Sequence, residues 1–152
     1  MKYSIRKQFT FEAAHQLETA ETAACHECIH GHSYTVELVI GAAVLDGHGM
    51  VLDFACLKPF KDEVMARWDH GLILHENKRH LYEPLIAVGA LKKSKVSFLF
   101  ANPTAESMAR ILFEQLERFL AGPFVGPSAK YVCVEKVRVH ETSTGWAEYR
   151  GM

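Results

Sequence analysis

HGHSYTVELVIG, residues 30–41, is the stretch that sets the fold of this chain. Side chains in a β-strand alternate between two faces, so every second residue of the stretch shares a face. The shared face is apolar along most of its length and carries two imidazoles at its start: His30, His32, Tyr34, Val36, Leu38 and Ile40. We therefore predict a strand whose buried face begins with a pair of histidines.

A second strand is predicted upstream, over residues 3–12, where Tyr3, Ile5, Phe9 and Phe11 broadly alternate with polar residues. His15 closes this strand, and residues 16–29 form a polar, Ala-rich loop. Antiparallel pairing with residues 30–41 would bring His15 near the histidine pair. Three neutral imidazoles with an open position are what a catalytic zinc requires. The competing interpretation is that each histidine is an ordinary polar surface or interface residue.

The rest of the chain alternates helical and extended patterns. A helix is predicted in residues 53–68, beginning near Ala55–Leu57 because Pro59 suits only a first turn. Residues 71–94 indicate a loop with a short helix around Leu81–Ala90, and residues 95–100 a short strand. Asn102-Pro103 opens a second long helix, with Pro at its first position, and Gly122-Pro123 ends it. Residues 130–141 and 146–149 are predicted as strands.

These elements predict an α+β fold in one domain, 1–152, with two helices on one face of a four-stranded antiparallel sheet. Such a small sheet leaves its edges exposed, which favours a homo-oligomer. The formal net charge of −1 provides no broad cationic field, so we expect no nucleic-acid or membrane partner. The first residues show no apolar signal segment, so we expect a cytoplasmic protein with reduced cysteines.

The segment CHECIHGHSY, residues 25–34, allows a second interpretation. Cys25, Cys28, His30 and His32 could form a closed structural zinc site. Ligand pairs in such sites usually come from two separated segments, whereas these four lie within eight residues. A redox Cys-x-x-Cys motif would require a βαβ context, which the pattern does not show.

Three carboxylates outside this segment are further candidates. Asp69 precedes His70 and could act with it as an acid–base pair, since a carboxylate sets the tautomer of an imidazole. Glu106 lies in the first turn of the second helix, where the helix dipole alone favours an acid. Glu141 is in phase with Val137 and Val139, so it should point towards a buried face. It then needs a donor partner, either a guanidine-like ligand edge or an internal Arg or turn.

In combination, six motifs resemble the 6-pyruvoyl-tetrahydropterin synthase and 6-carboxytetrahydropterin synthase family. They run through most of the chain in the order of the family: FEAAH (11–15), HGH (30–32), GMVLDFACLK (49–58), WDH (68–70), NPTAES (102–107) and VHET (139–142). The resemblance implies a tunnelling fold, in which subunits, commonly six, close an oligomeric β-barrel with active sites between them. It also implies zinc (Zn2+) on His15, His30 and His32.

The resemblance further implies roles for individual residues. A cysteine before HGH is the general base; Cys25 fits better than Cys28, because its longer loop can fold back over the metal. Asp69 and His70 form a proton relay. Glu141 anchors the 2-amino-pyrimidinone edge of a pterin. Thr104 and Glu106 line the pocket. Glu27 is an alternative base, because a subgroup of the family has glutamate before HGH and makes 6-hydroxymethyldihydropterin.

The implied substrate is 7,8-dihydroneopterin triphosphate. In the queuosine-pathway branch, which we favour, the product is 6-carboxytetrahydropterin, with acetaldehyde and triphosphate released. The alternatives are 6-pyruvoyl-tetrahydropterin formation by triphosphate elimination, the folate-type cleavage through Glu27, and a non-catalytic zinc- or pterin-binding scaffold. Residues 71–101 are longer than in compact members of the family and could reshape the pocket or an oligomer contact.

Overall fold

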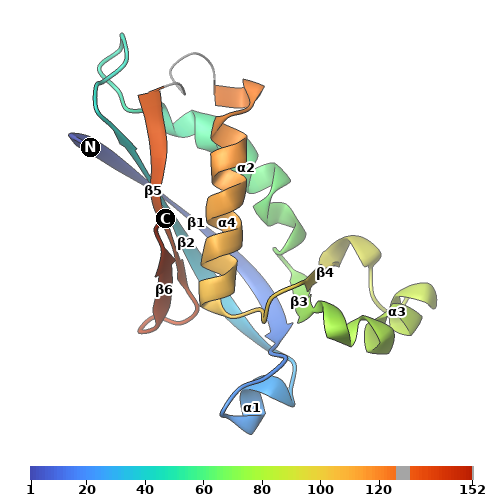
Figure 1. Ribbon diagram of the computed structural model, residues 1–152. Coiled ribbons are helices and arrows are strands. Elements are labelled where there is room, and N and C mark those ends of the chain that lie inside the picture. Colours follow the sequence, from blue (N-terminus) through green and yellow to red (C-terminus); the bar gives the residue numbers. More distant parts are fainter. Residues whose placement is uncertain (126–130, 152) are drawn as a thin grey trace.

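The computed structural model describes residues 1–125 and 131–151. A six-stranded sheet with the order β4-β3-β1-β2-β5-β6 forms the framework (Figure 1). Its strands are β1 (Tyr3–Gln16), β2 (His30–Ala42), β3 (Gly71–His75), β4 (Val96–Leu99), β5 (Val132–His140) and β6 (Trp146–Tyr149). The helices are α1 (Ala23–His26), α2 (Lys58–Glu63), α3 (Arg79–Ala87) and α4 (Ala105–Leu120).

The predicted pairing of the first two strands is confirmed. β1 and β2 run antiparallel with an unbroken register from Tyr3 opposite Ala42 to His15 opposite His30. β1 is four residues longer than the predicted strand 3–12, so His15 lies inside it. The alternation of β2 is also as predicted, since Tyr34, Val36, Leu38 and Ile40 are fully buried.

The two C-terminal strands complete the four predicted antiparallel strands. β5 pairs with β2, and β6 pairs with β5. Residue 130, which the prediction included in this strand, lies outside the described residues; β5 itself ends at His140, directly before Glu141.

The sheet differs from the prediction at its other edge, where β3 and β4 run parallel to β1; a short strand was predicted over residues 95–100, where β4 lies, but it was not assigned to the sheet. β3 pairs with the end of β1, and β4 pairs with β3, so the sheet is mixed. The strand β3 had been interpreted as part of a loop. Its apolar run of Leu72, Ile73 and Leu74 is too short for periodicity to separate strand from helix or loop. These residues form a strand because pairing with the edge of β1 buries them; Ile73 and Leu74 are fully buried there.

The helices α2 and α4 pack on one face of the sheet, as expected for an α+β fold, and the core lies between them and the strands (Figure 1). The predicted helix 53–68 is not continuous. α2 is flanked by 3-10 turns at Phe54–Leu57 and Met65–Arg67, and Pro59 lies in its first turn. Leu57, Phe60 and Trp68 are nevertheless buried, so the segment still packs an apolar side against the core.

The start of α4 is a second correction. Pro103 was predicted at the first helical position, but it precedes the N-cap, which is Thr104. The threonine hydroxyl accepts a hydrogen bond from the Ser107 N–H at 3.3 Å, as an N-cap residue should. Pro103 is thereby free to present its carbonyl to the sheet. In the described part of the chain, no helix combines the length and apolarity that crossing a membrane requires.

Candidate active site and metal centre

Three histidine side chains converge at the end of the β1–β2 hairpin. His15 lies on β1 opposite His30, and Ala13 lies opposite His32, so all three imidazoles project from the helix-covered face. One ring nitrogen from each lies within 4.8 Å of the others. The ring centroids are 4.5 to 5.1 Å apart. Strand register alone therefore builds a group of three imidazoles that could hold a metal ion.

The outer nitrogens of two rings are held by backbone carbonyls. His15 Nδ1 lies 2.8 Å from the Pro103 oxygen, and His30 Nδ1 lies 3.2 Å from the Cys28 oxygen. A carbonyl can only accept, so both Nδ1 atoms carry the proton in the neutral rings. The Tyr34 hydroxyl lies 3.2 Å from the same His15 nitrogen. Both Nε2 lone pairs are then directed inward, the usual arrangement around metal-bound histidines.

Within the part of the chain that the structure describes, the inward-facing nitrogens lack hydrogen-bond donors. His15 Nε2 and His30 Nε2 are 3.0 Å apart, with a lone pair on each. His32 Nε2 is buried and has no hydrogen-bond partner among the described residues, a costly state for a polar atom. A cation between the three nitrogens satisfies all of them. Nitrogen ligands ~2.1 Å from a tetrahedral metal such as zinc lie about 3.4 Å apart, so three neutral imidazoles within 4.8 Å of one another could hold such an ion once the rings move closer to that spacing.

The electrostatics of the cluster also suit a metal. Burial lowers the pKa of His15, against smaller raising effects of the Pro103 hydrogen bond and of Glu141. Burial likewise lowers the pKa of His32. Both imidazoles therefore stay neutral to lower pH than a free histidine, and the neutral form is the metal ligand. Burial raises the pKa of Tyr34, so its hydroxyl stays protonated.

Glu141 lies beside the histidine cluster. Its Oε1 is 3.5 Å from His15 Nε2 and 3.8 Å from His32 Nε2, and a third of its side chain is exposed. It follows β5 directly and points to the same face as the buried Val137 and Val139, which confirms the direction that the sequence predicted. No described Arg or Lys neutralises it. The carboxylate is therefore open to a ligand next to the imidazoles.

The candidate general bases lie on the segment between β1 and β2, which contains the one-turn helix α1 instead of only a loop. Cys25 is half-buried within α1, and its backbone is held by Leu17 and Thr22. Glu27 caps α1 and is exposed; its side chain is 3.8 Å from the His26 ring. Cys28 is exposed and precedes β2, and its carbonyl, not its thiol, contacts His30. In the described part of the chain, none of these three side chains makes a hydrogen bond or an ion pair with the cluster's nitrogens.

Asp69 and His70 form a pair on the turn before β3. Asp69 Oδ1 lies 3.1 Å from His70 Nδ1 and accepts the Glu12 N–H at 3.0 Å. That backbone hydrogen bond is the main reason why the pKa of Asp69 lies below its usual value, with His70 and Lys95 adding to it. His70 adopts a positive φ of 54° and donates its N–H to the Glu12 carbonyl. The pair is thus fastened to β1.

His70 is mostly exposed, and no hydrogen bond links it to the three-histidine cluster. It nevertheless lines the same shallow pocket of about 480 Å³ as His32. That pocket comprises residues of β1, β2 and the turn before β3: Glu12, Ala13, Ala14, Gly31, His32, Ser33, His70 and Gly71. The relay candidates are therefore near the hairpin that carries the metal candidates but are not in contact with them.

The two remaining predicted pocket residues lie at the start of α4. Thr104 is the N-cap, and its hydroxyl is engaged with Ser107. Glu106 is exposed in the first turn of the helix. The carbonyl of the neighbouring Pro103 contacts His15, so the N-terminus of α4 abuts the cluster.

Three contributors were missed by sequence reasoning: the Pro103 carbonyl, Asn102 and Tyr34. The Pro103 carbonyl fixes the tautomer of His15. Asn102 ties the loop after β1 to α4, because it accepts the Glu18 N–H at 2.7 Å and donates to the Thr19 carbonyl at 2.9 Å. A backbone carbonyl carries no sequence signal. Tyr34 did carry one, since it continues the face of His30 and His32.

Comparison with known proteins identifies the family of the chain. Residues 4–152 match the family model described as 6-pyruvoyl tetrahydropterin synthase. A 6-carboxy-5,6,7,8-tetrahydropterin synthase of Aquifex aeolicus is 31% identical over 167 aligned positions, covering 99% of both chains.

Two solved structures share the fold. An uncharacterised protein of Wolinella succinogenes superposes with a TM-score of 0.80 at 23% identity, covering 99% of this chain and 98% of that one. A Plasmodium vivax 6-pyruvoyltetrahydropterin synthase, studied as a variant in which a catalytic glutamate is replaced by alanine, superposes with a TM-score of 0.65 at 18% identity, covering 97% and 98%. From the family match across nearly its whole length, the chain belongs to the 6-pyruvoyl tetrahydropterin synthase family.

Proposed function

We propose that this protein is a zinc-dependent lyase that converts 7,8-dihydroneopterin triphosphate to 6-carboxy-5,6,7,8-tetrahydropterin. Acetaldehyde and triphosphate leave, and one water is consumed. The observation that carries the proposal is the position of Glu141, 3.5 Å from His15 and 3.8 Å from His32. A metal-binding cluster beside an open carboxylate suits a substrate that has a guanidine-like ring edge and, next to it, a hydroxylated side chain. Relatives named for this activity support the product assignment.

The pterin would be held through its ring edge. A carboxylate accepts two parallel N–H bonds from a 2-amino-pyrimidinone, which fixes both position and orientation. With Glu141 as this anchor, the substituent at C6 extends towards the histidines. When zinc is bound by His15, His30 and His32, it supplies Lewis acidity to the side-chain hydroxyls and to the adjacent C–H.

The remaining steps are proton transfers by residues of the chain. Cys25 would remove a proton from the substrate side chain as a thiolate. Asp69 and His70 would return protons to the leaving fragments. The Asp69 carboxylate would stabilise the positive charge that His70 carries while it is protonated. This assignment requires the α1 segment to fold over the cluster. From the family resemblance, we also propose that the site lies between subunits of a homo-oligomer, a hexamer.

Glu27 supports a second candidate function. It precedes the same HGH motif, and the Plasmodium vivax relative is described with a glutamate as its catalytic residue. With Glu27 as the base, the expected product is 6-hydroxymethyldihydropterin. Elimination of triphosphate to give 6-pyruvoyl-tetrahydropterin is the other outcome within the family.

Product analysis separates these candidates. The zinc-loaded protein is incubated with 7,8-dihydroneopterin triphosphate, and the products are identified by mass. We expect 6-carboxytetrahydropterin with equimolar acetaldehyde. A 6-hydroxymethyl or 6-pyruvoyl product would replace the proposed reaction by the corresponding alternative.

A non-catalytic zinc scaffold makes a different prediction. It would bind zinc but turn over no substrate, and a structural site through Cys25 and Cys28 would unfold when both are replaced by alanine. For the proposed enzyme, the double variant Cys25→Ala/Cys28→Ala keeps its fold and its zinc. Circular dichroism and zinc stoichiometry of this variant therefore distinguish a scaffold with a structural zinc site from the proposed enzyme.

A further inference from the structure

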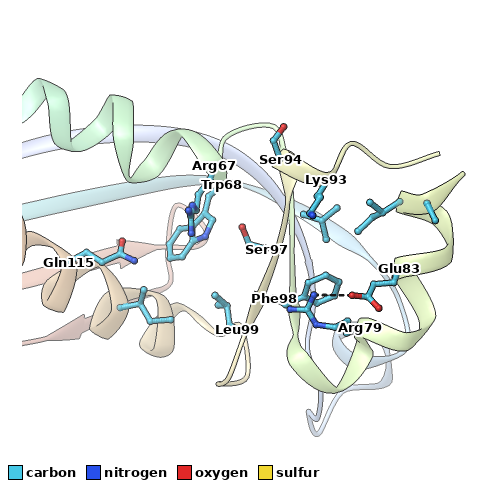
Figure 2. A pocket seen from close by; sticks show the side chains of 14 residues that line it. Arg67, Trp68, Arg79, Glu83, Lys93, Ser94, Ser97, Phe98, Leu99 and Gln115 are labelled. Atoms are coloured by element: carbon cyan, nitrogen blue, oxygen red, sulfur yellow. Dashed lines mark hydrogen bonds and ion pairs between the residues drawn. The ribbon is translucent and has the colours of Figure 1, made fainter. Parts of the chain in front are cut away.

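A cavity of about 700 Å³ lies at the β4 edge of the sheet, away from the candidate active site. Its volume is in the range of small-molecule sites. None of the residues proposed to hold zinc, pterin or a proton lines it. Its walls come from α3, from β4 with the turn before it, from one face of α4, and from Arg67 and Trp68 (Figure 2).

The inner wall is apolar. Trp68 is only 3% exposed, and Leu99 and Ile111 pack against the core. Because side chains alternate along a strand, β4 presents Val96 and Phe98 to one side and Ser97 and Leu99 to the other. Figure 2 shows Phe98 beside Arg79 on the α3 side, and Leu99 towards Gln115 of α4. An apolar wall with a few polar groups is typical of ligand pockets.

The single acidic side chain among these lining residues is already neutralised. Arg79 Nη1 lies 3.2 Å from Glu83 Oε1, and Arg79 Nη2 donates to Glu76 Oε2 at 2.8 Å. The guanidinium also stacks over the Phe98 ring, 4.3 Å from its centroid. These contacts make Arg79 and Glu83 part of the wall and remove their net charge from the cavity.

Two cations remain. The side chains of Arg67 and Lys93 line the cavity, and neither has an ion pair or hydrogen bond within residues 1–125 and 131–151. In the view of Figure 2, Ser94 and Ser97 lie between them. An exposed Arg or Lys without a partner is ordinary on a surface. Here both line a cavity with an apolar inner wall, and the uncompensated charge among its lining residues is positive.

We propose that this cavity is a second binding site, for a small amphiphilic anion. A carboxylate, sulfonate or phosphate group would lie between Arg67 and Lys93, and an apolar or aromatic body would pack on Trp68, Leu99 and Ile111. The proposal is independent of the reaction at the histidine cluster, because it uses none of that site's residues.

Tryptophan fluorescence gives a direct test, because the chain has two tryptophans and only Trp68 lines the cavity. The Trp146→Phe variant leaves Trp68 as the sole reporter. Zinc-loaded protein is titrated with 3-phenylpropionate and, separately, with uncharged 3-phenylpropanol. We expect a saturable change in Trp68 emission, with the acid binding roughly tenfold more tightly than the alcohol, since two exposed ion pairs contribute about that much.

Variants identify the groups responsible. In the Arg67→Ala/Lys93→Ala background, the affinity for the acid should fall to that for the alcohol, and the alcohol should be unaffected. Lys92→Ala is the matched control, because Lys92 is exposed and adjacent but does not line the cavity; it should change neither affinity. Equal affinities for acid and alcohol, an unchanged affinity in the double variant, or no emission change up to the solubility limit would each overturn the proposal.

Discussion

The two faces of the sheet differ in whether their buried polar side chains have partners. On the face away from the helices, Glu37 is 5% exposed but contacts Arg6 at 3.2 Å and His140 at 3.1 Å. Glu148 beside it is bound by Lys136 at 3.0 Å, by Arg138 and by Arg150. On the helix-covered face, His32 Nε2 is buried with no partner among the described residues.

This difference distinguishes polar groups that stabilise the fold from polar groups that bind a ligand. Polar groups that satisfy one another are a closed network, and removing one member costs stability. Polar groups that converge without satisfying one another cost free energy unless something external binds them. By this criterion the charged face stabilises the sheet, and the histidine face is built for a ligand.

The largest effect should follow removal of two of the three imidazoles. We expect His30→Ala/His32→Ala to lose stoichiometric zinc and to lower turnover by roughly 10³ or more, because a catalytic metal contributes several kcal/mol. His80→Ala is the control, since this exposed histidine bonds only within its own turn, at the start of α3. Zinc stoichiometry and initial rates provide the measurement. Full zinc binding by the double variant would remove the functional distinction between the two faces.

Replacing the general base should have the next largest effect. Cys25→Ala is expected to lower kcat by about 10²–10⁴, the usual contribution of a positioned base, with zinc and fold retained. Glu27→Gln and Cys28→Ala serve as paired controls with small effects. A large loss in Glu27→Gln with an active Cys25→Ala would transfer the role to the carboxylate.

The contact of Tyr34 with His15 should have a smaller effect. Tyr34→Phe removes the hydroxyl that lies 3.2 Å from His15 Nδ1, and outer-shell partners of this kind typically affect metal affinity by about tenfold or more. We expect zinc affinity to fall by roughly tenfold, as measured by competition with a chelator. Tyr82→Phe, which removes a hydrogen bond to Gln16, should leave it unchanged. Equal zinc affinities of the two variants would mean that the Tyr34 hydroxyl does not support the metal site and that the side chain contributes only packing.

The smallest effect is expected on the charged face, and it should appear in stability alone. Burial raises the pKa of Glu148, but hydrogen bonds from Lys136, Arg138 and Arg150 outweigh it and bring the pKa from 4.5 to about 2. A depressed carboxyl pKa stabilises the fold above the unfolded value of 4.5, and this contribution is lost as the pH falls towards 2. Glu148→Gln should therefore cost about 1–2 kcal/mol at pH 7.

Urea unfolding of wild type and Glu148→Gln at several pH values tests this expectation. The difference in unfolding free energy should be constant above about pH 5 and should shrink below it, following the titration of the carboxyl. Zinc content should be equal in both proteins. A pH-independent difference would show that packing, and not charge, is lost.

The sequence predicted much of this architecture because the signals were local. Alternation over residues 30–41 placed His30, His32 and Tyr34 on one face, and the antiparallel register with β1 brought His15 opposite His30. The end of α4, just before Gly122, was also predicted correctly from the sequence. The strand β3 was not predicted, and the short strand predicted over residues 95–100 was not assigned to the sheet, since a few apolar residues pair as a strand only when an edge such as the end of β1 is available.

By itself, the sequence determined which residues share a face, and hence that three imidazoles could meet and that Glu141 points inward, because a strand's period of two is a property of its backbone. The tertiary structure alone decided the tautomers of those imidazoles, through the carbonyls of Pro103 and Cys28. It also decided that α3, β4 and α4 enclose a cavity lined by Arg67 and Lys93. Such contacts join segments far apart in the chain, and no local pattern encodes them.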